Sequence, residues 1–188
     1  QDERVKKAAS EAALKFGAGA GASRLITGDV PLNAQLEKKL ADLKGTEAAL
    51  VFGSGYLANI SLTPALMRRG GLVLLDEFSH SCMFAGARLS GADIEVFRHN
   101  DVDHARHLLS QSKASRKLLM TETVFSMDGD RAPLEDLSKL CEAHGAWLMT
   151  DDAHGLGILR EPNPAPIQMG TFSKLSLIHI SEPPRLDD

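Results

Sequence analysis

Two carboxylates and a histidine follow an apolar run in the second half of the chain. Asp151, Asp152 and His154 come directly after residues 146–150, whose composition predicts a buried strand. Adjacent carboxylates are costly to bury without partners. They could cap a helix beside a solvated histidine, or bind a metal, although no third and fourth ligand is evident. A buried carboxylate that faces a protonated heterocyclic nitrogen fits the pattern better.

A lysine among small residues is a second candidate. Lys174 ends the segment Gly170-Thr171-Phe172-Ser173-Lys174. A single lysine is usually a solvated surface residue. In a desolvated site, however, a lysine amine can act as a Schiff-base nucleophile. The hydroxyls of Thr171 and Ser173 could then hold a phosphate group.

Two glycine-rich segments could approach an anion. Residues 53–56, Gly-Ser-Gly-Tyr, join an expected strand to an expected helix, and they fit a tight turn and a phosphate cradle equally well. Residues 17–21 alternate Gly and Ala, as a dinucleotide fingerprint does. That fingerprint must follow a strand, whereas residues 11–16 read as a helix, so a flexible turn is favoured.

The elements that position these residues alternate between short strands and helices. Strands are expected at 47–52, 72–76, 93–97, 117–123 and 146–151, with helices at 31–44, 55–69, 80–89, 102–111 and 134–143. This alternation predicts an α/β fold with a mostly parallel sheet and helices on both faces. Ligands of such sheets bind beyond the carboxyl ends of the strands. We therefore expect Ser54, His80, Ser126 and Asp151 to converge there.

Composition excludes several classes of protein. The 188 residues are 43% hydrophobic and 24% charged, with a net charge of −4 and no basic stripe, so a nucleic-acid partner is not expected. Apolar runs fall short of the ~20 residues of a membrane helix. Cys82 and Cys141 lack the spacing of a zinc site or a disulfide framework. A cytoplasmic protein with inert thiols is expected.

Taken together, the motifs resemble those of the α-oxoamine synthases, a family of pyridoxal 5′-phosphate (PLP) enzymes. The similarity lies in residues 23–28, 36–59, 126–134 and 151–155, within a match over 16–159 and 168–174. It implies the large domain of an aspartate-aminotransferase-like, fold type I transferase, usually a homodimer with active sites at the subunit interface. The implied reaction removes the α-proton of an amino acid, joins the carbanion to an acyl thioester and releases carbon dioxide.

The resemblance assigns roles to individual residues. Lys174 matches the lysine that binds PLP covalently, and Asp151 matches the partner of the pyridine nitrogen. His80 matches the histidine that stacks on the ring, while Ser126 and His154 match the residues beside the ring hydroxyl. The segments that hold the phosphate contain Ser54, Gly55, Tyr56 and Thr171.

One branch of the family is most similar to this chain. Residues 126–133 and 151–154 look like those of the enzymes that condense L-alanine with pimeloyl-CoA, or its acyl-carrier-protein thioester, in biotin synthesis. The alternatives are 5-aminolevulinate synthases, which tend to have Glu and Val at positions 152 and 153, and glycine C-acetyltransferases, which tend to have Ser at 153.

The chain departs from the family pattern in two places. The stretch between His154 and Lys174 is shorter than the family norm, and residues after Lys174 match nothing in the family. We expect an N-terminal helix and Gly-rich segment at 1–30, an incomplete PLP-binding large domain at 31–174 and a disordered tail at 175–188. An incomplete enzyme is therefore predicted, and an inactive fragment that binds cofactor weakly or not at all is the alternative.

Overall fold

The computed structural model describes residues 2–159 and 161–174, so the predicted tail at 175–188 lies outside the described residues. The chain divides into two compact units, one up to Val51 and one from Phe52 onwards. This division does not test the predicted three-part organisation, which stays a prediction.

The first unit contains two helices, α1 (Glu3–Phe16) and α2 (Pro31–Lys44). The Asp2 carboxylate caps α1 by accepting a hydrogen bond from the Arg4 amide, and α2 begins at a proline, which needs no amide donor there. Gly45 ends α2 in the left-handed conformation, with φ of 65°. The Gly-Ala segment at 17–21 follows helix α1 and not a strand, which contradicts a dinucleotide fingerprint.

The prediction of a strand at 47–52 is wrong, because these residues pair with no strand in the described part of the chain. Side chains bind the backbone of this segment instead. The Val51 amide donates to Oε1 of Glu37 at 2.9 Å, and Nη1 of Arg24 donates to the Val51 carbonyl oxygen at 3.4 Å. Arg24 and Glu37 also form an ion pair of 2.7 Å. The polar groups of Val51 are therefore satisfied without a neighbouring strand.

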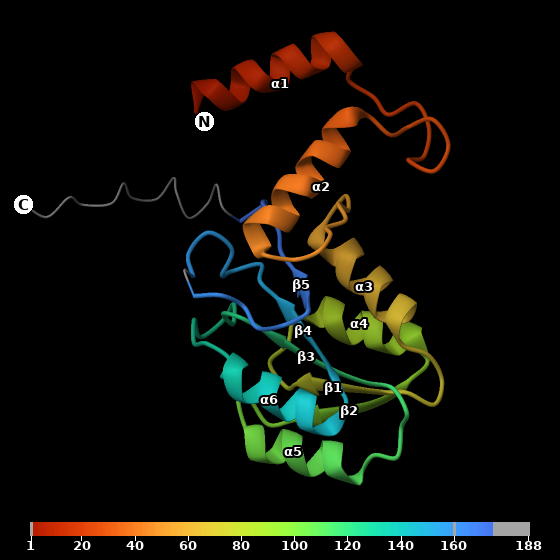
Figure 1. Ribbon diagram of the computed structural model, residues 1–188, viewed down its shortest axis with the longest axis vertical. Helices are drawn as coiled ribbons and strands as arrows, with labels where there is room; N and C mark the ends of the chain where they lie inside the picture. Colours follow the sequence, from red (N-terminus) through yellow and green to blue (C-terminus); the bar gives the residue numbers. More distant parts are fainter. Residues whose placement is uncertain (1, 160, 175–188) are drawn as a thin grey trace, which may run out of the picture. The chain divides into compact units, whose positions relative to one another are not determined.

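The second unit is built on a parallel sheet of the order β2-β1-β3-β4-β5 (Figure 1). Its strands are β1 (Leu72–Asp76), β2 (Asp93–Phe97), β3 (Lys117–Glu122), β4 (Trp147–Asp151) and β5 (Ile167–Met169). Its helices are α3 (Gly55–Leu66), α4 (Ser81–Ser90), α5 (Val102–Gln111) and α6 (Leu134–His144). Strand β5 was not predicted, because three residues are too few for a clear apolar pattern.

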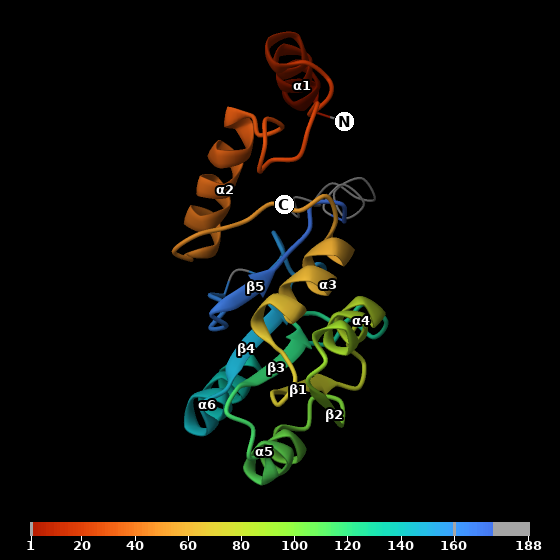
Figure 2. The same ribbon diagram turned by 90° about the vertical axis from the view of Figure 1, so that its right-hand side faces the viewer.

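Alternate residues of the strands enter two separate cores. In β1, Val73 and Leu75 pack in the core beneath α3 and α4, whereas Leu72 and Leu74 pack in the core beneath α5 and α6. Side chains that alternate across a strand produce this division. Figure 2 shows the two helix pairs on opposite faces of the sheet. The predicted α/β fold with helices on both faces is confirmed.

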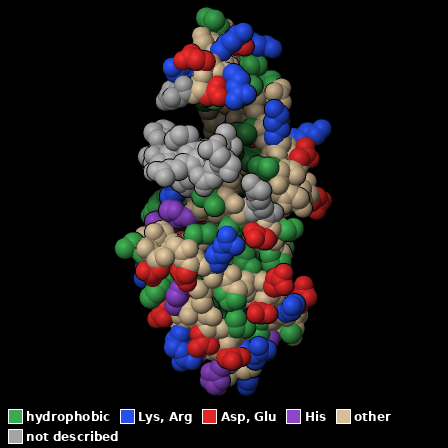
Figure 3. All heavy atoms as spheres, turned by 90° about the vertical axis from the view of Figure 1, so that its left-hand side faces the viewer, with side chains coloured by type: hydrophobic (Ala, Val, Ile, Leu, Met, Phe, Trp, Pro, Cys, Tyr) green, Lys and Arg blue, Asp and Glu red, His purple; other side chains and the backbone are tan. Residues whose placement is uncertain are grey.

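None of the described helices is long and apolar enough to cross a membrane. On the face in Figure 3, Lys and Arg side chains alternate with Asp and Glu side chains and do not form a basic patch.

Candidate active site

Three acidic residues lie side by side at the carboxyl ends of the central strands of the sheet. Asp76 ends β1, Glu122 ends β3 and Asp151 ends β4, and each is buried. The parallel register pairs Glu122 directly with Asp151. The predicted site residues follow these same strand ends, as the rule for parallel sheets requires.

Asp151 faces the helices α3 and α4. Its Oδ2 accepts a hydrogen bond of 2.8 Å from Nδ2 of Asn59, and its Oδ1 accepts one of 2.9 Å from the Ala153 amide. Burial nevertheless raises the pKa of Asp151, since it removes the charged carboxylate from water. Asp152 has a different partner, because its Oδ1 accepts a 2.5 Å hydrogen bond from the Thr123 hydroxyl. The two adjacent carboxylates therefore have separate environments.

Lys174 and His154 meet beside Asp151. Nζ of Lys174 lies 2.7 Å from Nε2 of His154. Burial, and then the positive charge of Lys174, lower the pKa of His154. The charges of Lys174 and His80 both act on Asp151 and favour its ionised form. Four of the predicted site residues thus share one electrostatic environment.

His80 precedes α4, and its ring is hydrogen-bonded to the first turn of this helix. Nδ1 of His80 accepts a hydrogen bond of 3.2 Å from the Cys82 amide and lies 2.9 Å from the Cys82 thiol sulfur. The His80 amide donates to Oε1 of Glu122 at 2.7 Å. The side chain of His80 is exposed, so its ring is accessible from the strand ends.

Glu122 is a buried carboxyl group that sequence reasoning missed. Burial, and then the negative charge of Asp151, raise the pKa of Glu122 to about 7. The backbone amides of His80 and Ser126 bind it and favour its ionised form. A signal was present in the sequence, because Glu122 ends an apolar run with a carboxylate, as Asp151 does. Asn59 and Cys82, also missed, gave no such signal, since each lies within an ordinary helix pattern.

The residues predicted to hold a phosphate lie around the start of α3. The Ser54 hydroxyl caps this helix by accepting a hydrogen bond of 3.1 Å from the Leu57 amide. A Cβ atom added to Gly55 would lie 3.7 Å from Cβ of Thr171, so these two predicted residues are neighbours. The Thr171 hydroxyl lies 2.8 Å from that of Ser173. An N-terminal helix end with hydroxyl groups beside it suits an anion.

The side chains of Tyr56 and Ser126 are not brought into these contacts. Tyr56 is 54% exposed, and the Ser126 side chain is exposed as well. The structure places the backbone of Ser126, but not its hydroxyl group, against another site residue.

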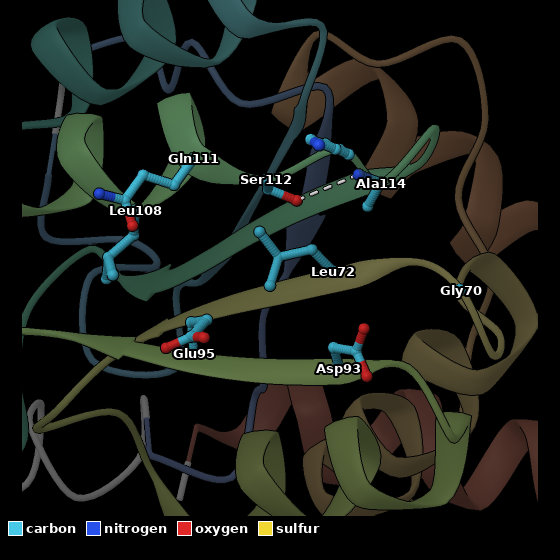
Figure 4. A pocket seen from close by; sticks show the side chains of 9 residues that line it. Gly70, Leu72, Asp93, Glu95, Leu108, Gln111, Ser112 and Ala114 are labelled. Atoms are coloured by element: carbon cyan, nitrogen blue, oxygen red, sulfur yellow. Dashed lines mark hydrogen bonds between the residues drawn. The ribbon is translucent and has the colours of Figure 1, made fainter.

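A hollow of about 530 Å³ lies away from this site, at the amino ends of β1 and β2 (Figure 4). Leu72 and Asp93, the first residues of these strands, line it together with Ser112 and Lys113. None of the predicted site residues lies in its wall. Its position at the wrong end of the parallel strands separates it from the candidate site.

Comparison with known proteins decides the family. The model of the family "Aminotransferase class I and II" matches residues 1–180. The chain belongs to this family. The match begins earlier and ends later than the resemblance recognised in the sequence. This aminotransferase-family chain is 57% identical over 175 residues to an 8-amino-7-oxononanoate synthase of Methylorubrum populi, covering 92% of the chain and 45% of that protein.

Other relatives agree with this assignment. An 8-amino-7-oxononanoate synthase of Methylocella silvestris is 56% identical, with 90% of the chain and 52% of that protein covered. Among solved structures, a serine palmitoyltransferase from S. paucimobilis with a bound PLP–myriocin aldimine has a TM-score of 0.86 and 36% identity, with 92% of the chain and 46% of that protein covered. The chain spans about half the length of the curated relatives it matches.

Proposed function

We propose that this chain is part of a PLP-dependent acyltransferase that condenses L-alanine with pimeloyl-CoA, or its acyl-carrier-protein thioester, to form 8-amino-7-oxononanoate. The observation that carries the proposal is the buried Asp151 at the end of β4, beside the Lys174–His154 contact. The names of relatives at 55–57% identity, 8-amino-7-oxononanoate synthases, support the choice of product.

The described residues fit PLP on chemical grounds. Asp151 is a desolvated carboxylate with a raised pKa, and a cationic ring nitrogen would supply the positive partner that stabilises its charge. Lys174 offers an amine at the same end of the sheet, and its neighbour His154 can accept a proton from it. The start of α3 with Ser54 offers donors to an anionic group.

Bound PLP supplies an electron sink for a carbanion next to the amino nitrogen. Asp151 would hold the proton on the ring nitrogen, and Lys174 would anchor the group covalently. His80 would cover one face of the ring, while Ser126 and His154 would bind the ring hydroxyl.

The phosphate group would bind among Ser54, Gly55, Tyr56 and Thr171. The amides at the start of α3 point along the helix axis towards such an anion. Gly55 leaves space beside Thr171 that a side chain would occupy. The predicted large domain at 31–174 would therefore contain every residue of the proposed cofactor site.

Assembly and location extend the proposal. A homodimer of the full-length enzyme, with active sites at the subunit interface, is proposed from the family resemblance, and sedimentation of that enzyme would test it. A cytoplasmic location and the absence of nucleic-acid partners are retained as predictions, which cell fractionation and a nucleic-acid binding assay would test.

Covalent labelling tests the proposed site. The chain is mixed with PLP and reduced with borohydride, and the modified lysine is then identified by peptide mass spectrometry. We expect modification of Lys174, and its loss in Lys174→Ala but not in Lys139→Ala, which removes an exposed lysine of α6. Equal labelling of several surface lysines would contradict the proposal.

The partial length of the chain favours one alternative, a fragment that binds the cofactor without turnover. Labelling of Lys174 together with failure to release carbon dioxide from alanine and pimeloyl-CoA would select this alternative. Replacement of alanine by glycine as the active substrate would instead indicate another α-oxoamine synthase.

A further inference from the structure

Asn59 links Asp151, a proposed cofactor-binding residue, to Cys82 through one buried amide group. It lies on α3 and has no exposed surface. Its Nδ2 donates to Oδ2 of Asp151 at 2.8 Å and to the sulfur of Cys82 at 3.1 Å. The first of these contacts spans 92 residues of sequence.

The orientation of the Asn59 amide follows from its partners. The reverse orientation would place the amide oxygen Oδ1 against the carboxylate of Asp151, and two acceptors would then face each other. In the observed orientation Oδ1 is buried without a partner among the described residues. The charge-assisted hydrogen bond to Asp151 is the stronger interaction and determines the arrangement.

The second amide contact continues towards His80. The Cys82 amide donates to Nδ1 of His80, so this nitrogen is an acceptor. The Cys82 sulfur accepts from Asn59 and can donate its own hydrogen to the same nitrogen, 2.9 Å away. Burial raises the pKa of the Cys82 thiol, which keeps this hydrogen in place. The ring proton of a neutral His80 therefore belongs on Nε2.

We propose that Asn59 is a positioning residue that holds the Asp151 carboxylate oriented and, through Cys82, fixes the ring orientation of His80. The importance of these two targets rests on the proposed function, but the hydrogen-bond chain itself does not. No other described side chain donates a hydrogen bond to Asp151, so removal of Asn59 would leave only the Ala153 amide.

The close approach of α3 and α4 places Asn59 at this depth. A Cβ atom added to Gly86 would lie 2.5 Å from the backbone oxygen of Asn59 and 3.0 Å from the Thr63 hydroxyl. The glycine therefore allows the two helices to pack closely enough for Asn59 to reach both Cys82 and Asp151.

The test is a titration of the Asp151 carboxyl group by carbon-13 NMR in the chain without cofactor. Asn59→Leu keeps the size of the side chain and removes its donors. In this variant we expect the proton affinity of the Asp151 carboxylate to rise by about tenfold, because the carboxylate loses one charge-assisted hydrogen bond that favours its ionised form. Asn59→Asp should raise it further, because two carboxylates would then share a proton.

Other ionisable groups around Asp151 are unchanged in these variants, so the difference isolates Asn59. They are Glu122 of β3, His80 before α4, Cys82 of α4, and His154 and Lys174 after β4 and β5. Thr63→Val is the matched control. It removes a buried hydroxyl of α3 that donates to the backbone carbonyl oxygen of Asn59 and does not contact Asp151. It should lower the melting temperature without moving the Asp151 titration.

His80 gives a second readout, which does not depend on the stability of the Asn59 variants. In nitrogen-15 spectra, Cys82→Ser should keep both contacts to Nδ1 of His80. Cys82→Ala removes the side-chain contact and keeps the backbone-amide hydrogen bond, so it should shift the Nδ1 signal only part of the way towards its unbonded value. Unchanged Asp151 titration in both Asn59 variants, or unchanged His80 signals in Cys82→Ala, would overturn the proposal. Failure of the wild-type chain to bind PLP would contradict only the proposed function.

Discussion

Lys174 and His154 lie with their side-chain nitrogens 2.7 Å apart, at the end of the sheet where the strands present their buried carboxylates. Two cations could not share this distance in a desolvated site without strong repulsion. Burial and the neighbouring Lys174 lower the pKa of His154, so the imidazole is the partner that stays neutral and accepts a hydrogen bond.

This contact predicts a role for His154 in the reactivity of Lys174. His154→Leu should slow the reaction of Lys174 with PLP by about 100-fold at neutral pH, which is the lower end of the contribution of a positioned proton acceptor. His154→Gln, which keeps an acceptor, should be less affected. The rate of borohydride-trapped labelling measures this effect, and equal rates in all three proteins would refute it.

Asp151→Asn removes the negative charge of this side chain and keeps its shape. The Asn59 amide can still donate to the new amide oxygen, so the fold should be retained and the melting temperature should stay within a few degrees of the wild type. PLP binding should weaken by about tenfold or more, because the ring nitrogen would lose its anionic partner. Fluorescence titration with PLP measures the affinity. Wild-type affinity in this variant would remove Asp151 from the site.

Glu122 predicts a loss of stability with increasing pH. Its pKa rises from an ordinary 4.5 to about 7 in the folded chain, so the folded state binds a proton that the unfolded state has released. Stability from this group is therefore complete below pH 4.5 and declines as the pH rises through 7. The loss is on the order of 2 kcal/mol after allowance for screening.

Glu122→Gln should abolish this decline, because the amide does not ionise and can still accept from the His80 amide. Urea unfolding of both proteins without cofactor at pH 5 and pH 8 measures the difference. A parallel fall in both proteins would show that another group causes it.

His99 follows β2 and connects the end of β1 to the segment between β3 and α6, and it predicts a second pH effect. Its Nδ1 lies 2.9 Å from Asp76 and its Nε2 lies 2.7 Å from Asp130, so both nitrogens need protons to donate. Burial lowers the pKa of His99, but the two carboxylates outweigh it and the net shift is upward. The ring also packs between Phe78 and Phe125, with centroid distances of 4.4 Å to each.

A raised histidine pKa stabilises the fold fully below the unfolded value of about 6.5, and this contribution is lost as the pH rises through the folded value. His99→Gln should cost about 2–3 kcal/mol at pH 6, since Asp76 is fully buried, and less at pH 9. Unfolding at the two pH values tests this. An equal cost at both would mean that the ring acts only by packing.

Gly86→Ala should disturb the site through the helix pair α3 and α4. The added methyl group would contact the Asn59 carbonyl oxygen, and overpacking of this kind costs about 1–3 kcal/mol. PLP affinity should fall with stability, whereas Arg88→Ala, on the exposed side of α4, should change neither. A stable Gly86→Ala with wild-type affinity would show that the helices can separate without harm.

The sequence by itself determined the α/β fold and most of the residues that lie at the carboxyl ends of its strands. Apolar runs of five or six residues, broken by amphipathic helices, leave few arrangements other than a parallel sheet. The carboxyl ends of such strands must then meet, which is why His80, Asp151 and His154 could be placed together in advance. The prediction of a strand at 47–52 is wrong because the side chains of Arg24 and Glu37, and not a neighbouring strand, bind the backbone of Val51.

Only the tertiary structure decided how the site is held. Asn59 and Asp151 are far apart in sequence, and their contact depends on how closely α3 packs on α4 and the sheet. The raised pKa of Glu122 depends on burial beside Asp151, a property of the pairing of β3 and β4 and not of either strand alone. Local sequence specifies residue types and periodicity, whereas desolvation and hydrogen-bond partners arise only when distant segments pack together.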